Sequence, residues 1–77
     1  MRKYVDVVGV GKKRTSKAGR EYYPVAFTYE DKFISGVKAA TVNFFTDSLG
    51  GYVPCVGDTV DVVMHESNFN LFIDAVL

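Results

Sequence analysis

The sequence predicts a small all-β domain. Strand-forming residues alternate with polar ones at a period of two over several short runs, and helical spacing is nearly absent. Of its 77 residues 48% are hydrophobic and 14% aromatic, which is typical of a globular chain. One domain is expected over residues 1–77. A domain this small buries a limited core, so self-association would stabilise it.

The first half of the chain is expected to form a long hairpin. A valine-rich strand runs from Arg2 to Lys13, and Gly9 and Gly11 within it predict a bulge or tight bend. A polar loop at Arg14–Gly19 leads into a second strand at Arg20–Glu30.

Three further strands are expected after it. Pro24 marks the second strand as an edge or a bulge, because proline has no N–H to donate. A turn at Asp31–Gly36 precedes a third strand at Val37–Phe45. The connection over residues 46–58 contains Gly-Gly and a proline, which disfavour a helix.

The last two strands are expected at Thr59–Glu66 and Phe69–Leu77, with a turn at Ser67-Asn68. Five short strands with a long connection between the third and fourth predict a five-stranded antiparallel OB-type barrel with extended hairpins. An SH3-like barrel is the main structural alternative.

Strand alternation also predicts which side chains face inward. Tyr22 and Tyr23 must lie on opposite faces of their strand, and we expect Tyr23 to begin the inward stripe. Phe44 and Phe69 fit a dimer seam or base stacking equally well. The expected core comprises Val5, Val7, Phe27, Phe45, Val60 and Phe72.

Charge is strongly segregated although the net charge is zero. Residues 1–20 carry +6 and residues 21–77 carry −6. Cations neutralise phosphates and exposed aromatic rings stack on unpaired bases. The first loop and its flanks combine both, which favours nucleic-acid contact over a merely solvated loop. The residues concerned are Lys12, Lys13, Arg14, Lys17, Arg20 and Tyr22.

Catalytic and metal-binding motifs are not found. The single cysteine, Cys55, excludes an internal disulfide, and with the single histidine, His65, it cannot form a structural zinc site without carboxylates or a second chain. Gly11-Lys12 lacks the other residues of a phosphate-binding loop. We therefore expect no enzyme activity, no cofactor, no metal and no small-molecule substrate. The later carboxylates show no catalytic spacing: Asp58, Asp61, Glu66 and Asp74.

A cytoplasmic location without membrane contact is expected. No apolar run approaches the roughly 20 residues that span a bilayer. The short apolar stretch near the N-terminus is interrupted by Asp6, unlike that of a signal peptide.

Three motifs are similar to those of a known family. They are KAGREY at Lys17–Tyr22, TDSLGGYVPCVGDTV at Thr46–Val60 and FNLFID at Phe69–Asp74. Between Lys12 and Asp74 the chain resembles the gene V type of single-stranded DNA-binding proteins from filamentous bacteriophage. The resemblance implies an OB-fold homodimer that coats single strands cooperatively.

The resemblance also implies residue roles. Lys12, Lys17 and Arg20 would contact phosphates, and Tyr22 would stack on a base. Phe69 would lie on the hairpin that forms the dimer axis and can reach DNA on the neighbouring chain. Asn43 and Ala75 stand where the family has cations, and Lys38 stands where it has an aromatic. The full expected nucleic-acid set is Lys12, Lys13, Arg14, Lys17, Arg20, Tyr22, Lys38 and Phe69.

The expected function is non-catalytic, largely sequence-independent binding of single-stranded DNA, with RNA left open. The protein would belong to a phage or mobile replicon and coat single strands during replication in the bacterial host cytoplasm. The alternative is a small OB- or SH3-like protein-interaction module with no nucleic-acid role.

Overall fold

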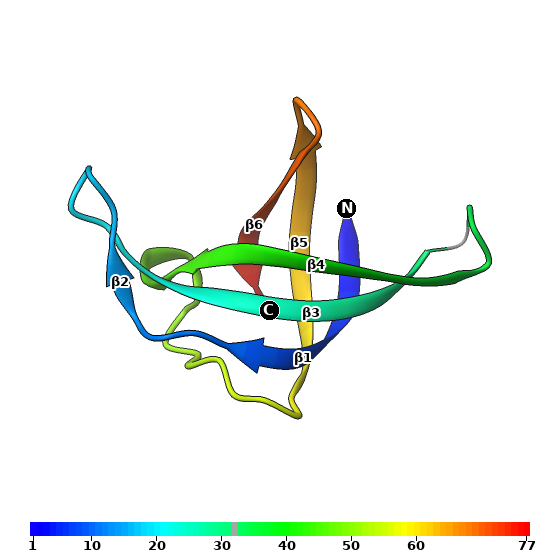
Figure 1. The fold of residues 1–77 in the computed structure, drawn as a ribbon, viewed down its shortest axis with the longest axis horizontal. Helices are drawn as coiled ribbons and strands as arrows, with labels where there is room; N and C mark the ends of the chain where they lie inside the picture. The colour runs from blue at the N-terminus through cyan, green and yellow to red at the C-terminus, as the bar shows by residue number, and fades with distance from the viewer. Residues whose placement is uncertain (32) are drawn as a thin grey trace.

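The computed structural model describes residues 1–31 and 33–77, and its strands form one bent antiparallel sheet (Figure 1). Position 32, inside the expected turn at Asp31–Gly36, lies outside the described residues. The elements are β1 (Arg2–Val10), β2 (Arg14–Thr15), β3 (Glu21–Asp31), β4 (Gly36–Phe45), a 3-10 turn η1 (Thr46–Ser48), β5 (Thr59–Ser67) and β6 (Asn70–Val76).

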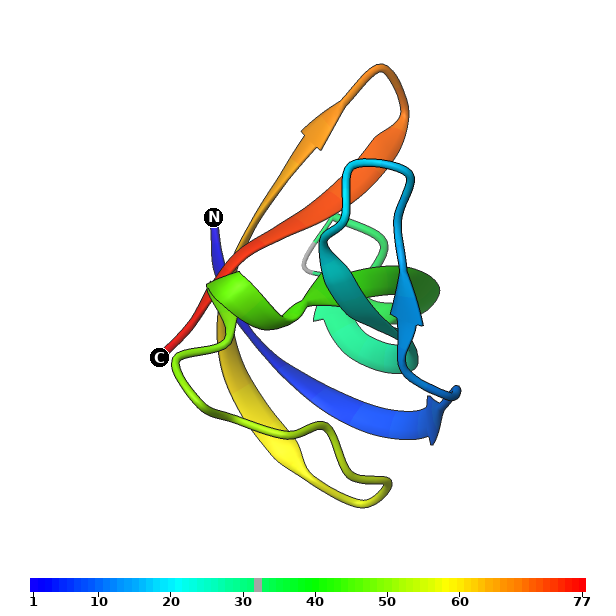
Figure 2. The ribbon, with the colours of Figure 1, turned by 90° about the vertical axis from the view of Figure 1, so that its left-hand side faces the viewer.

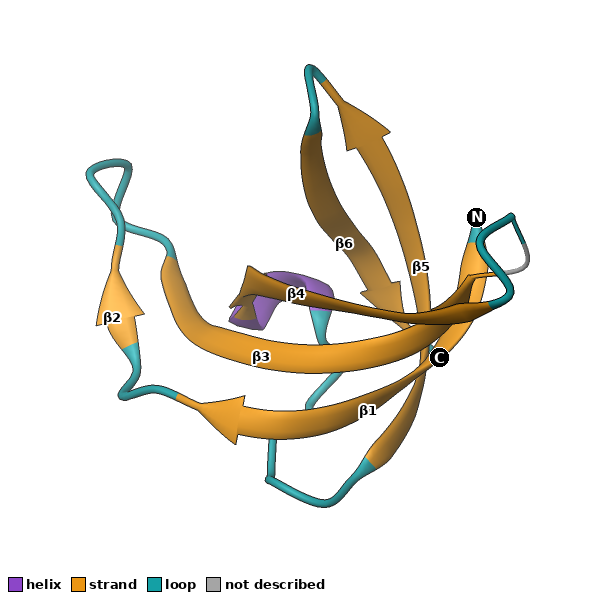
Figure 3. Ribbon diagram, turned by 45° about the vertical axis from the view of Figure 1, so that its right-hand side comes forward, coloured by secondary structure: helices purple, strands orange, loops and turns teal. Residues whose placement is uncertain are grey.

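The five long strands lie in the order β4-β3-β1-β5-β6, and β2 continues the pairing of β1 along β3 (Figure 3). All pairs are antiparallel, which confirms the all-β antiparallel prediction. The sheet is not closed into a barrel, because the described residues form no hydrogen-bond ladder between β4 and β6. Within the described chain, no helix is long and apolar enough to cross a membrane.

The first strand differs from its expected extent. It ends at Val10, and the two-residue strand β2 forms after a short break. The register shifts between Val7 and Gly9, so the bulge that the glycines predicted is present. The edge prediction from Pro24 is wrong, because β3 lies between β1 and β4. The Pro24 carbonyl accepts the Gly11 N–H at 2.8 Å, in the break between β1 and β2, where a missing proline N–H removes no ladder bond.

The core lies on the concave side of the sheet. Its buried members are Val5, Val7, Val25, Phe27, Tyr29, Phe44, Leu49, Val60, Val62, Met64 and Ile73. The inward stripe on β3 is confirmed: Val25, Phe27 and Tyr29 are buried, and Tyr23 packs against them.

Three aromatic assignments were wrong. Phe44, expected in a seam or a stack, is fully buried, whereas Phe45, expected in the core, is only half-buried. Phe44 pairs with Tyr23 on the inner face and Phe45 with Tyr22 on the outer face. Phe72 is 44% exposed and stacks on His65 with ring centroids 5.1 Å apart. Alternation fixed the spacing of these rings, but not the register that decides which face is buried.

Candidate nucleic-acid interface

A tight loop presents the cations between β2 and β3. The Gly19 N–H donates to the Ser16 carbonyl at 2.9 Å, and the Ser16 N–H donates to the Arg20 carbonyl at 2.8 Å. Gly19 has φ +81°, which a glycine adopts without steric cost. This is the three-residue hairpin pattern in which a turn is followed by a left-handed glycine. Lys17 therefore lies exposed at the tip of the cationic hairpin, residues 12–20.

Three side chains form a row across the base of this hairpin. Arg14 of β2 pairs with Tyr22 of β3, and Tyr22 pairs with Phe45 of β4. Residues directly opposite in an antiparallel ladder project from the same face. The row therefore lies on the outer face, the side of β1, β2, β3 and β4 away from the core. The Tyr22 and Phe45 rings are tilted by 50° with centroids 5.3 Å apart.

Arg20, at the end of the loop, lies against the Phe45 end of this row. Its Cζ lies 4.0 Å from the centroid of the Phe45 ring. Its Nε and one terminal nitrogen donate to the two carboxylate oxygens of Asp47 at 2.9 and 2.8 Å. These hydrogen bonds lower the pKa of Asp47 and raise the pKa of Arg20. The Ser48 hydroxyl donates to the same carboxylate at 3.3 Å, so η1 holds Asp47 in place.

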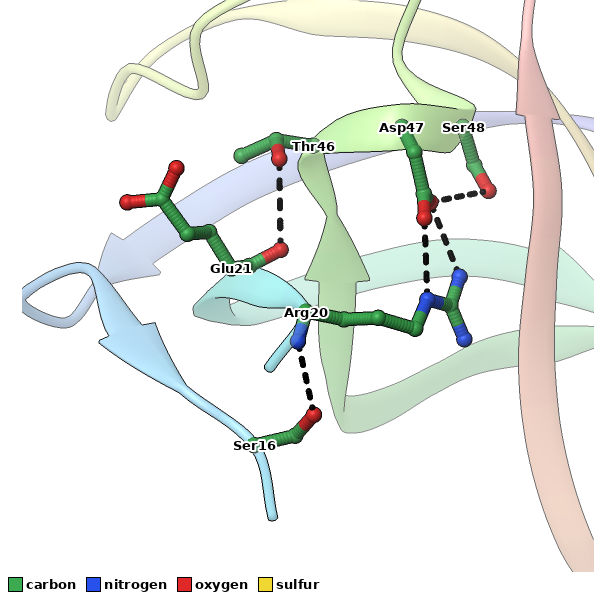
Figure 4. A network of polar contacts seen from close by, with 6 residues as sticks. All are labelled: Ser16, Arg20, Glu21, Thr46, Asp47 and Ser48. Carbon is green, nitrogen blue, oxygen red and sulfur yellow. Dashed lines mark hydrogen bonds and ion pairs between the residues drawn. The ribbon is translucent and has the colours of Figure 1, made fainter. Parts of the chain in front are cut away.

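The backbone around Arg20 is also tied down. The Arg20 N–H donates to the Ser16 hydroxyl at 3.2 Å, and the Thr46 hydroxyl donates to the Glu21 carbonyl at 3.3 Å. In Figure 4 the contact between Arg20 and Ser16 lies within the hairpin. The contacts of Arg20 with Asp47 and of Glu21 with Thr46 link the base of the hairpin to η1. The base of the hairpin is thus attached to η1 at two points, and among the described residues the tip makes no such contact.

The other hairpin cations differ in their surroundings. Lys13 forms an ion pair with Glu21 at 3.3 Å. Lys12, Arg14 and Lys17 are exposed and have no carboxylate within ion-pair distance among the described residues. These three positive groups can meet an external anion without breaking a contact.

Beyond the row, the outer face carries small side chains. Gly9 pairs with Ala26, and Ala26 pairs with Thr41 across the next strand. A Cβ at Gly11 would lie 3.1 Å from Cγ of Pro24, so the chain passes very close to the proline ring. The outer face beyond the aromatic row therefore presents short side chains along β3, and the backbone of a bound polymer could approach it closely.

Two of the eight expected site residues lie elsewhere. Lys38 pairs with Tyr29 near the opposite end of the β3–β4 hairpin, and its ammonium lies 3.0 Å from Asp31. That hydrogen bond raises the pKa of Lys38. Phe69 lies fully exposed at the tip of the β5–β6 hairpin, which extends away from β3 and β4 (Figures 1 and 2). The other six lie on the cationic hairpin or at its base: Lys12, Lys13, Arg14, Lys17, Arg20 and Tyr22.

Phe45 and Asp47 belong to this site although the sequence did not single them out. Phe45 was expected in the core and Phe44 outside it, and the structure reverses the two. Asp47 lies 27 residues from Arg20 along the chain, so only the fold brings them together. No local sequence signal identifies that contact.

Most carboxylates considered for catalysis have structural partners. Asp61 binds Arg2, Asp74 lies 2.8 Å from Nδ1 of His65, and Asp58 accepts the Tyr52 hydroxyl at 2.7 Å. Among residues 1–31 and 33–77, no group of three or more His, Cys, Asp or Glu could hold a metal ion.

Comparison with protein-family models, curated proteins and solved structures gave no match.

Proposed function

We propose that this chain is a non-catalytic protein that binds single-stranded DNA, with little sequence preference, on the cationic hairpin and the adjoining outer face. The observation that carries the proposal is the row of Arg14, Tyr22 and Phe45 on the cationic hairpin. Arg14 and two further hairpin cations, Lys12 and Lys17, have no carboxylate partner among the described residues. Cations along a strand path neutralise phosphates, and rings stack on any base because every base has a π-face. Little discrimination among sequences follows from that chemistry.

The geometry favours a single strand over a duplex. The aromatic row is a surface feature of the sheet that lies beside short side chains on β1, β3 and β4. Unpaired bases expose the faces that Tyr22 needs for stacking, whereas duplex bases are already stacked. RNA offers the same faces, so we propose DNA as the ligand and RNA as a competitor to be measured beside it.

We further propose that the protein acts as a homodimer of the gene V type, in a phage or mobile replicon, and coats single strands during replication. The hairpin of β5 and β6 supports a dimer contact because it presents Phe69 fully exposed and Phe72 partly exposed. An isologous dimer is the commonest closed assembly and would cover such a surface. Residues Glu66 to Leu71 would lie near its two-fold axis.

The test is a titration of fluorescent oligo-dT with the pure protein at several salt concentrations, with the mass measured by size exclusion and light scattering. We expect binding that weakens steeply with salt, because bound cations displace counterions. Oligo-U and duplex DNA of equal length serve as competitors. Absence of oligo-dT binding at low salt, with a folded protein, would contradict the proposal.

A protein-interaction module is the second candidate. Phe33 is fully exposed at the β3–β4 turn, with Ile34 and Val37 also exposed beside it. This apolar tip lies at the opposite end of the long axis from the cationic hairpin (Figure 1). Binding through such a surface would change little with salt, so the same salt series separates the two candidates.

A further inference from the structure

We propose that Arg20 binds a base and not a phosphate: Asp47 and Phe45 hold its guanidinium as a flat platform on which a nucleobase stacks, beside the Tyr22 ring. This inference rests on the proposed function and assigns a role to one of its residues. It also makes Asp47 and Phe45 positioning residues, because they act on the ligand through Arg20.

One of the two hydrogen-bonding edges of the Arg20 guanidinium, the edge formed by Nε and one terminal nitrogen, is already occupied. Recognition of phosphate by arginine uses two parallel N–H donors of the guanidinium fork. In this protein Nε and one terminal nitrogen point at the Asp47 carboxylate, at 2.9 and 2.8 Å. A phosphate that took these donors would first have to displace a carboxylate that Ser48 also holds.

The face of the guanidinium is available. The guanidinium carbon Cζ lies over the Phe45 ring, 4.0 Å from the ring centroid, and 47% of the Arg20 side-chain surface remains exposed. The guanidinium is planar and weakly hydrated, and unpaired bases stack on it as they do on aromatic rings. Support from Phe45 on one side and Asp47 along the edge restricts the side chain before the ligand arrives, so less rotamer entropy is lost on binding.

Neighbouring cations are placed differently. Lys17 lies at the hairpin tip, and Arg14 lies at the far end of the row from Phe45, both without a carboxylate partner in the described chain. These two cations can contact the phosphates of a nucleic-acid strand that passes along the edge of the row. Within one hairpin, phosphate contact and base contact are thus divided between different cations.

The experiment compares oligo-dT with an oligomer of the same length made of abasic sites. Both oligomers carry the same phosphates. The dissociation constant for the abasic oligomer divided by that for oligo-dT therefore reports the contribution of the bases to binding, and general charge effects largely cancel in this ratio. The proteins are wild type, Arg20→Ala, Arg20→Lys, Asp47→Asn and Lys17→Ala. Each ratio is measured together with the salt dependence of oligo-dT binding, and thermal melts check that each variant is folded.

We expect Arg20→Ala to reduce the ratio by about fivefold or more, the equivalent of one stacked base. Arg20→Lys keeps the charge but loses the plane, so it should reduce the ratio similarly and keep the salt slope. Asp47→Asn should also reduce the ratio, because the platform is no longer held. Lys17→Ala should leave the ratio unchanged and lower the salt slope.

A different pattern would overturn the inference. If Arg20→Ala lowers the salt slope and leaves the ratio unchanged, Arg20 is a phosphate contact. If Asp47→Asn strengthens oligo-dT binding with a steeper slope, Asp47 competes with phosphate. Either result leaves strand binding itself intact. Failure of the proposed function would appear differently, as absence of oligo-dT binding by the wild type.

Discussion

The Tyr22 and Phe45 rings lie directly opposite each other in the β3–β4 ladder, with centroids 5.3 Å apart on the outer face. The next pair in the same ladder, Tyr23 and Phe44, lies on the inner face. Two adjacent aromatic pairs therefore separate the proposed ligand contact from core packing. This arrangement allows the two roles to be tested with matched variants.

Tyr22→Ala should weaken binding of oligo-dT by about 1–3 kcal/mol, the contribution of one stacked base. Its effect on folding should be limited to the lost ring pair, about 0.5–1.5 kcal/mol. Tyr23→Ala should reverse this balance, because Tyr23 packs against the core and its loss approaches the about 3–5 kcal/mol of a buried aromatic. Urea unfolding and oligo-dT titration of both variants measure the two quantities. The reverse pattern would mean that the outer face is not the binding face.

Lys17→Ala should lower the salt slope of oligo-dT binding by about 0.7, the value for one phosphate contact on a single strand. The matched control is Lys38→Ala, since Lys38 pairs with Asp31 at the other end of the β3–β4 hairpin. We expect the Lys38 variant to retain the wild-type slope. Equal slopes in wild type and Lys17→Ala would remove the hairpin tip from the strand path.

Tyr52 makes stability sensitive to alkaline pH. Partial burial, together with its hydrogen bond to Asp58, raises its pKa from 10.0 to about 12. The folded state then holds the Tyr52 proton more tightly than the unfolded state, so this contribution is intact below pH 10 and is lost as pH rises toward 12. The free energy of unfolding should fall less over this range in Tyr52→Phe than in wild type. Parallel curves for the two proteins would contradict this assignment.

Local features of the sequence were sufficient for the strands and for the cationic hairpin. Alternation located all five long strands, and the glycine at position 19 marked the loop that the structure shows. These features depend on residues close together in the chain, which is why they can be inferred from it. Gly9 and Gly11 predicted a bulge or tight bend in the first strand, but not that the strand ends at Val10 and that β2 forms separately, because this break depends on Pro24 in the neighbouring strand.

Contacts between distant segments could not be predicted in the same way. Whether Phe44 or Phe45 is buried depends on the register of β4 against β3, and a shift by one residue would exchange them. The Asp47 contact to Arg20 requires η1 to fold back against the hairpin base. The two supports of the proposed base platform were therefore visible only in the structure.

The tip of the β5–β6 hairpin contains an unfavourable backbone conformation. Asn68 and Phe69 have φ of +52° and +64°, the left-handed pair of a two-residue type I′ turn. Asparagine tolerates this conformation, but a bulky residue in the second position is disfavoured by roughly 1–2 kcal/mol. Since the Phe69 side chain is fully exposed, it has no packing within the described chain to offset that cost.

Phe69→Gly should therefore stabilise the protomer by about 1 kcal/mol, because glycine adopts this conformation freely. If the ring forms the proposed dimer contact, the same substitution should reduce the mass in solution to that of one chain. Phe69→Ala separates the two effects: it removes the ring but keeps a Cβ at positive φ, so it should lose the dimer without the gain in stability. Melts at concentrations below dimer dissociation measure the protomer alone, and light scattering at higher concentration measures assembly. Phe33→Ala, at the other exposed tip, is the control and should remain dimeric. Retention of the dimer in both Phe69 variants would place its interface on another surface, while the expected stabilisation by glycine would still hold, because it depends only on the turn.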